Sequence, residues 1–354
     1  MRVVSALALM LASVTAAQAQ MGESKTFRDW IAGCDNTKSC TALSLPKESD
    51  DEVAFLRLDR AAGPGSGPTL ALKLRTQKLK PRFDIELVLD GTAFPAAGRP
   101  LPATSVDGEV AEIAIAPSDA EALIAAARKA TILTARVDAR TFTISLAGSV
   151  AAMLWIDERQ GRLNTPSALI RKGTVGTAPP APAVHVIASK PAAGKPLAKD
   201  QIAALVKAMR TEVNRREADS CEDTPDGFTG ADDAWPLGDA LRLVSLACSR
   251  GAYNVNSQFW LVTGRDVAKA KPAVFEGGGS TPSNELVNSD FDPKTGQVMF
   301  YAKGRGIGDC GASGSYGWTG MRFSLLQFSA MSECRQIPGD DWITLFRSVG
   351  TAAN

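Results

Sequence analysis

Six cysteines constrain this chain most, because a proline-rich stretch divides them into a group of two and a group of four. The first group is Cys34 and Cys40, and the second is Cys221, Cys248, Cys310 and Cys334. Six cysteines allow 15 pairings, and confining each bridge to one side of the stretch leaves three. We favour bridges between sequence neighbours, Cys34–Cys40, Cys221–Cys248 and Cys310–Cys334. Structural bridges of this kind indicate an oxidising compartment.

The N-terminus has the features of a secretory signal peptide. Arg2 supplies a positive charge, Val3 to Val14 is apolar, and Ala17-Gln18-Ala19 fits a cleavage site. The apolar run is shorter than the roughly 20 residues that span a bilayer, although a retained N-terminal anchor remains an alternative. We therefore predict removal of residues 1–19, no transmembrane segment, and a periplasmic or secreted protein.

Charge and length limit the classes of partner and the number of domains. Removing residues 1–19 deletes Arg2, so 39 basic residues become 38 against 38 acidic ones. A net charge of zero gives no overall field that would favour nucleic acid. The remaining 335 residues (354 minus 19) fit two domains.

The proline- and alanine-rich stretch at 174–199 predicts a linker, with domains at 20–173 and 200–354. It contains His185, the single histidine of the chain. A histidine relay needs its imidazole held firmly, and zinc sites with several histidines need more than one. The pattern therefore favours a non-enzymatic protein with no cofactor and no metal site, although it does not decide whether the protein is an enzyme.

Periodicity predicts an α+β fold that is mostly β. In the first domain, alternation predicts strands at 53–58, 69–74 and 83–89 and a hairpin at 132–146. Two short helices are expected there, one opened by a capping box at Ser118 and Glu121, and one from Ser149 to Gln160 that ends at Gly161.

The second domain is predicted to be an antiparallel β-domain opened by one amphipathic helix, which Asp200 caps. Its expected strands are 240–248, 258–262, 296–301 and 321–329, with a turn at 292–296. A final short helix is expected from Asp341 to Arg347.

Five segments carry a family resemblance: FRDWIAGCDNTKSCTA at 27–42, AAMLWIDERQGRLNTPSALIRKG at 151–173, LACSRGAYN at 246–254, KGRGIGDCG at 303–311 and YGWTGMRFSL at 316–325. Together they resemble the proteobacterial envelope proteins classed as domain of unknown function 1176. The opening from Phe27 to Cys34 is also similar to invasion-associated locus B proteins, which implies a β-sandwich-like first domain. The resemblance implies an envelope location and no particular activity.

The segment around Cys310 is the candidate ligand site. Its glycines match G-x-G-x-x-G, but no helix pattern follows, so a dinucleotide site is not expected. Two cations flank glycines whose backbone N–H groups can form an anion-binding concavity, and two aromatic residues follow closely. The alternative is a structural turn whose tryptophan fills the core. The candidate ligand-binding residues are Lys303, Arg305, Gly306, Gly308, Asp309, Tyr316 and Trp318.

Three functions remain open on this evidence. The favoured one is non-enzymatic binding of an envelope component or protein partner. The second is inhibition of an envelope-active hydrolase such as a lysozyme, with the segment from Cys310 to Trp318 as the protruding loop. The third is a hydrolase that uses paired carboxylates. The acidic stretch from Asp219 to Asp233 could hold Ca²⁺, but it does not match an EF-hand, and a solvated loop is favoured.

Overall fold

The protein is mostly β in the computed structural model, which describes residues 20–49, 52–94, 98–217, 220–221, 232–278 and 280–352. Strands account for 45% and helices for 14%, which confirms the predicted α+β, mostly β class. The predicted signal peptide lies outside the described residues. Within the described ranges, no helix is both long enough and apolar enough to cross a membrane.

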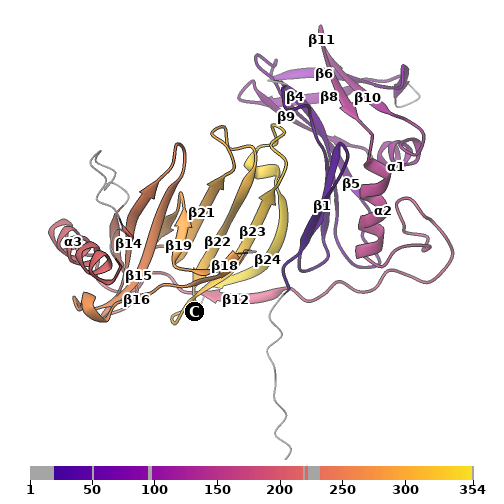
Figure 1. Ribbon diagram of the computed structural model, residues 1–354. Coiled ribbons are helices and arrows are strands. Elements are labelled where there is room, and N and C mark those ends of the chain that lie inside the picture. The colour runs from indigo at the N-terminus through magenta and orange to yellow at the C-terminus, as the bar shows by residue number, and fades with distance from the viewer. Residues whose placement is uncertain are drawn as a thin grey trace, which may run out of the picture.

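One large antiparallel sheet forms the N-terminal half. Its strand order is β1-β2-β3-β4-β5-β9-β8-β6-β10-β11, and β7 pairs with β6. The strands are β1 (Glu23–Phe27), β2 (Trp30–Cys34), β3 (Cys40–Ser44), β4 (Val53–Arg60), β5 (Thr69–Arg75), β6 (Arg82–Leu89), β7 (Thr92–Phe94), β8 (Leu101–Val106), β9 (Val110–Ile115), β10 (Ile132–Val137) and β11 (Arg140–Ser145). The sheet curls until β11 contacts β4, so one face encloses a core (Figure 1).

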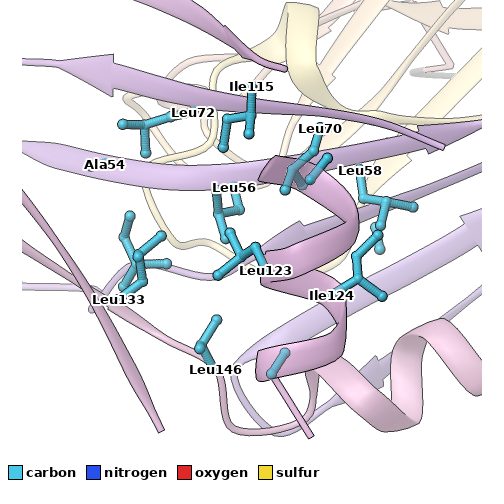
Figure 2. Close-up of a cluster of buried hydrophobic side chains, with 14 of the residues drawn as sticks. Ala54, Leu56, Leu58, Leu70, Leu72, Ile115, Leu123, Ile124, Leu133 and Leu146 are labelled. Atoms are coloured by element: carbon cyan, nitrogen blue, oxygen red, sulfur yellow. The ribbon is translucent and has the colours of Figure 1, made fainter. Parts of the chain in front are cut away.

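Alternating residues explain this curled sheet. In β6, Phe83, Ile85 and Leu87 are buried while Asp84 and Glu86 are exposed, as the period of two predicts. Figure 2 shows leucines of β4 and β5 meeting Leu123 and Ile124 of the helix that covers them. The predicted hairpin is also confirmed, because β10 pairs with β11 across a turn at Asp138, whose φ is 52°.

Two helices close the N-terminal half: α1 (Pro117–Ala126) and α2 (Ser149–Arg159). The predicted capping box at Ser118 is wrong. The helix begins at Pro117 after Ala116 and has no side-chain cap, because proline at the first helical position already fixes φ and lacks the free N–H. The predicted end of the second helix is confirmed, since Gly161 has φ of 64°.

The described part of the C-terminal half forms three sheets. The six-stranded sheet has the order β12-β24-β23-β22-β21-β20, and the five-stranded sheet has β13-β14-β15-β16 with β19 beside β15, while β17 pairs with β18. The strands are β12 (His185–Ser189), β13 (Asp233–Pro236), β14 (Leu241–Arg250), β15 (Val255–Thr263), β16 (Lys271–Pro272), β17 (Phe275–Gly277), β18 (Ser280–Ser283), β19 (Glu285–Val287), β20 (Asp290–Asp292), β21 (Gln297–Lys303), β22 (Gly311–Trp318), β23 (Phe323–Met331) and β24 (Ile343–Ala352).

The amphipathic helix α3 (Lys199–Arg216) packs on β13 and β14 through Leu205, Met209 and Val213. The predicted cap at Asp200 is wrong by two residues. Ala198 is the N-cap, and the Gln201 side chain accepts its backbone N–H at 3.0 Å. Asp200 instead lies in the first turn, where a carboxylate interacts favourably with the helix dipole.

The predicted final helix from Asp341 to Arg347 is also wrong. A 3₁₀ turn at Gly339–Asp341 precedes β24, which pairs with β23 on one side and β12 on the other. Ile343 and Phe346 of this strand are buried. Pairing on two sides and β-branched residues outweigh the weak helical pattern of this segment.

The segment predicted as a linker contributes a strand to the C-terminal sheet. His185 begins β12, which pairs in parallel with β24. The imidazole is exposed, and its ring centroid lies 6.5 Å from that of Phe346. The histidine therefore occupies a sheet edge.

The two halves share one hydrophobic cluster. Ile31 and Phe55 from the first sheet pack in it with Trp342 and Ile343 from the last strand region. Strand β24, in yellow, lies beside β1 in Figure 1, and the N–H of Gly22 donates to the carbonyl of Leu345 at 2.8 Å. The three favoured disulfides, Cys34–Cys40, Cys221–Cys248 and Cys310–Cys334, are all present.

Candidate functional site

The loop between β21 and β22 is tight and cross-linked. Lys303 pairs with Gly311 at its base, and Cys310 joins Cys334. Gly311 has φ of 134°, and a Cβ there would lie 2.0 Å from the carbonyl oxygen of Ala302, so only glycine fits. The glycines therefore shape a turn that leads into a strand, and the predicted absence of a helix after it is confirmed.

Arg305 is the structural centre of this loop. Its Nε and Nη2 donate to the two carboxylate oxygens of Asp309 at 2.7 and 2.6 Å, and Nη2 also donates to the carbonyl of Cys334. Its Nη1 donates to Glu48 of the N-terminal half at 2.9 Å. The guanidinium thus holds the loop closed and links it to the other half.

Asp309 is buried beneath the guanidinium and accepts the backbone N–H of Gln336 at 2.7 Å. Burial raises the pKa of Asp309, but the hydrogen bonds from Arg305 and Gln336 outweigh it and hold the pKa below its usual range. The carboxylate is therefore ionised at neutral pH and serves as an internal anchor.

A second loop, between β14 and β15, packs against the first. Asn254 donates to the carbonyl of Lys303 at 2.9 Å and accepts the N–H of Lys303 at 3.2 Å. Asn288 donates to the side-chain oxygen of Asn254 at 2.9 Å and to the carbonyl of Tyr301 at 2.9 Å. Two segments that lie far apart in the sequence are thereby fixed as one platform.

Two large side chains stand exposed on this platform. Tyr253 is 41% exposed, and Ile307 is 65% exposed. The hydroxyl of Tyr253 donates to the carbonyl of Gly304 at 3.0 Å, and its ring lies against Gly306. We call Tyr253, Ile307 and Lys303 the loop-pair surface. Sequence reasoning missed Tyr253 and Ile307, although both lie inside the family-like segments.

Lys303 differs from Arg305 in that no carboxylate among the described residues pairs with its side chain. Within the described residues, its ammonium group makes no hydrogen bond or ion pair, and its contacts to Asn254 are through the backbone. Gly306 is exposed, whereas Gly308 is buried and its carbonyl accepts the hydroxyl of Tyr301. Among the described residues, Lys303 is therefore a cation of this loop without an ionic partner.

Tyr316 and Trp318 do not join the other candidate residues. Both are buried in the cluster shared by the two halves, where the rings of Tyr316 and Phe275 lie 5.0 Å apart and those of Trp318 and Phe323 lie 5.2 Å apart. Burial raises the pKa of Tyr316 to about 12. Sequence proximity misled here, because both residues lie on β22, beyond the loop.

The same strand occupies the segment from Cys310 to Trp318 that was expected to protrude, so that expectation is wrong.

The acidic stretch is described only at its end. Asp232 binds Arg210 at 2.7 Å, and Asp233 accepts the N–H of Ala234. Asp219 and residues 222–231 lie outside the described ranges. Among the residues that are described, no cluster of three or more histidine, cysteine or acidic side chains is placed to hold a metal.

A pair of carboxylates does line one cavity of about 860 Å³, between α1 and β7. Asp119 binds Arg99 at 3.1 Å. Asp90 accepts the backbone N–H groups of Thr131 and Ile132 and the Thr131 hydroxyl, and these hydrogen bonds lower its pKa. A general acid needs a raised pKa, so the lowered pKa of Asp90 does not suit that role.

Comparison with known proteins gives a family but no activity. The family described as "Protein of unknown function (DUF1176)" matches residues 24–348. The uncharacterized protein YpfG of Escherichia coli (strain K12) is 28% identical over 336 residues, which cover 91% of this chain and 92% of the relative. No solved structure matches the chain.

Proposed function

This chain belongs to the DUF1176 family, and we propose that it is an exported, non-enzymatic protein that binds another envelope protein through the loop-pair surface. The observation that carries the proposal is the exposure of Tyr253 and Ile307 on a platform held by a disulfide, an ion pair and asparagine hydrogen bonds.

Three disulfides support the proposed export, because such bridges persist in oxidising compartments such as the periplasm or the extracellular space. The signal-peptide pattern of residues 1–19 points the same way. We further propose that the chain has two domains, at 20–173 and 200–354. The similarity of the first domain to invasion-associated locus B proteins supports a sandwich-like fold there.

The chemistry of the loop-pair surface suits a protein partner. Tyrosine contributes a large contact area with little loss of conformational freedom and is enriched among residues that dominate binding energy. Ile307 adds an exposed apolar contact, and Lys303 offers a charge for the rim of an interface. Because the platform is already fixed, binding would not have to order it.

Inhibition of an envelope-active hydrolase is the second candidate. One observation favours it: the loop that carries Ile307 is short, stapled by Cys310–Cys334 and braced by Arg305. Inhibitor complexes commonly use such pre-organised segments. A carboxylate-based hydrolase is less well supported, because Asp90 lacks the raised pKa of a general acid.

Affinity capture from periplasmic extract tests the proposed surface. Ile307→Asp places a charge in the centre of the surface, and Met321→Asp is the matched control, since Met321 is 86% exposed in the turn after β22. We expect a partner that the wild type and Met321→Asp retain and Ile307→Asp loses. Equal capture by all three proteins would remove this surface from the proposal. An assay of lysozyme activity with the same three proteins distinguishes an inhibitor from a protein that binds a partner without inhibiting it.

A further inference from the structure

A second pocket lies in the N-terminal half, away from the loop-pair surface. Its volume is about 300 Å³, and it lies between α1 and two loops, residues 64–68 and 166–169. Prolines 64, 68 and 166 and the side chains of Ile124 and Leu169 give it apolar walls. Ser66 and Ser167 add polar atoms, so the pocket combines apolar and hydrogen-bonding surface.

Arg60, at the end of β4, lines this pocket although it is only 3% exposed. Its Nη1 donates to Asp157 at 3.3 Å, its Nε to the carbonyl of Ser66 at 3.4 Å, and its Nη2 to the carbonyl of Ser167. A guanidinium has five N–H groups. Three are used in these contacts, and the described residues offer no acceptor for the other two.

The charges around Arg60 do not balance. Arg162 is fully buried nearby and donates to Gln160, Ser167 and the carbonyls of Ala61 and Gly63. Asp157 is the buried acid of the group, and it also accepts the N–H groups of Leu169 and Ile170. Among the described residues, this buried group therefore holds two guanidinium groups and one carboxylate, an excess of one positive charge.

Other charged groups at the pocket are exposed. Glu121 and Lys172 line its rim and carry opposite signs. Burial, and then the neighbouring Arg162, lower the pKa of Arg60 to about 10, while Asp157 acts in the other direction. A pKa near 10 leaves Arg60 charged at neutral pH. A buried charge without a full set of partners is costly, so an anion in the pocket would be stabilised.

We propose that this pocket binds a small organic carboxylate, with its carboxylate on the free N–H groups of Arg60 and its short hydrocarbon chain against the proline and leucine walls. Arginine matches a planar carboxylate through paired hydrogen bonds. The apolar walls distinguish this ligand from inorganic phosphate, which has no apolar part to bury. A volume of about 300 Å³ lies at the lower end of the range for small-molecule pockets, so a small carboxylate fits with room to spare.

Two glycines at the pocket allow a test that leaves Arg60 in place. A Cβ at Gly65 or Gly67 would meet no atom within 4 Å, and neither glycine has a positive φ. Gly67→Leu and Gly65→Leu therefore add a bulky side chain to the wall of the pocket without straining the backbone. Gly238→Leu is the matched control, because Gly238 is equally unhindered and lies in the C-terminal half.

The experiment is calorimetric titration of the full mature chain with butyrate, using butyramide and inorganic phosphate as comparison probes. We expect saturable binding of butyrate with a dissociation constant of about 1 mM, and at least about tenfold weaker binding of both other probes. Each leucine variant at the pocket should weaken butyrate binding about tenfold, with an unchanged melting temperature, while Gly238→Leu binds as the wild type does. Absence of saturable butyrate binding, equal binding of butyramide, tighter binding of phosphate, or full binding by both pocket variants would overturn the proposal.

Discussion

The guanidinium of Arg305 binds both carboxylate oxygens of Asp309, four residues further along the same loop, at 2.7 and 2.6 Å. Arg305, which we predicted from the sequence as a ligand-binding residue, is therefore already paired with a carboxylate. Its role is to close the loop and, through Glu48, to join the loop to the N-terminal half. The exposed Tyr253 and Ile307 depend on the rigidity that results.

Asp309→Asn should destabilise the protein by about 3 kcal/mol, because it leaves the charge of Arg305 without its buried partner. Urea unfolding measures this difference. Asp84→Asn is the control, since Asp84 is exposed on β6 and should change stability by less than about 0.5 kcal/mol. Equal effects of the two variants would contradict a structural role for the ion pair.

Asn254→Ala should separate the two loops and cost about 2 kcal/mol, because it removes the hydrogen bonds to the backbone of Lys303 and one of the acceptors of the Asn288 amide. Amide hydrogen exchange should rise at Lys303 and the residues after it. Asn256→Ala removes only an exposed contact to Ser249 and serves as the control. Unchanged exchange at Lys303 would show that the platform does not need Asn254.

Gly33→Ala should weaken the packing of the two halves. A Cβ at Gly33 would lie 2.5 Å from the Cγ2 of Ile343, which is fully buried between the halves. Overpacking of this kind costs about 1–3 kcal/mol and should lower the melting temperature. Gly350→Ala meets no atom within 4 Å and should leave the melting temperature nearly unchanged. A neutral result for both would mean that the junction tolerates extra volume.

The stability of α3 should depend on pH through Glu212. Hydrogen bonds from Arg215 and then Arg216 lower the pKa of this carboxyl from 4.5 to about 2 in the folded protein. A lowered folded-state pKa stabilises the fold above the unfolded value and loses that effect as the pH falls through the folded value. The melting-temperature difference between wild type and Glu212→Gln should therefore be constant from pH 5 to 7 and shrink between about 4.5 and about 2.

Glu86→Gln is the control for that pH series, because Glu86 is exposed on β6. Its melting-temperature difference from the wild type should show no comparable change over this pH interval. A difference between wild type and Glu212→Gln that persists down to pH 2 would contradict the assigned partners of Glu212.

Local patterns in the sequence predicted the elements that depend on neighbours in the chain. The alternation of β6, the hairpin at Asp138 and the three disulfides follow from residues that are close in sequence. The final strand was mistaken for a helix because its pairing with β12 and β23 is a long-range fact.

The loop that we propose as part of the site was chosen from the sequence, but the contacts its residues make could not be predicted. The segment around Cys310 could be singled out from its glycines and cations. However, the partner of Arg305, the burial of Tyr316 and the contact between Asn254 and Lys303 depend on the fold. The burial of Arg60 could not be predicted from the sequence, because it results from contacts with a loop about 100 residues further along the chain.

Site-specific photo-crosslinking in intact cells tests the central claim most directly. A photoreactive amino acid replaces Ile307 in one variant and Met321 in the other; both residues are exposed, one in the loop before β22 and the other in the turn after it. The account predicts one discrete protein adduct from position 307 and none of that mass from position 321. No adduct at position 307, or the same adducts from both positions, would contradict a protein-binding role for the loop-pair surface.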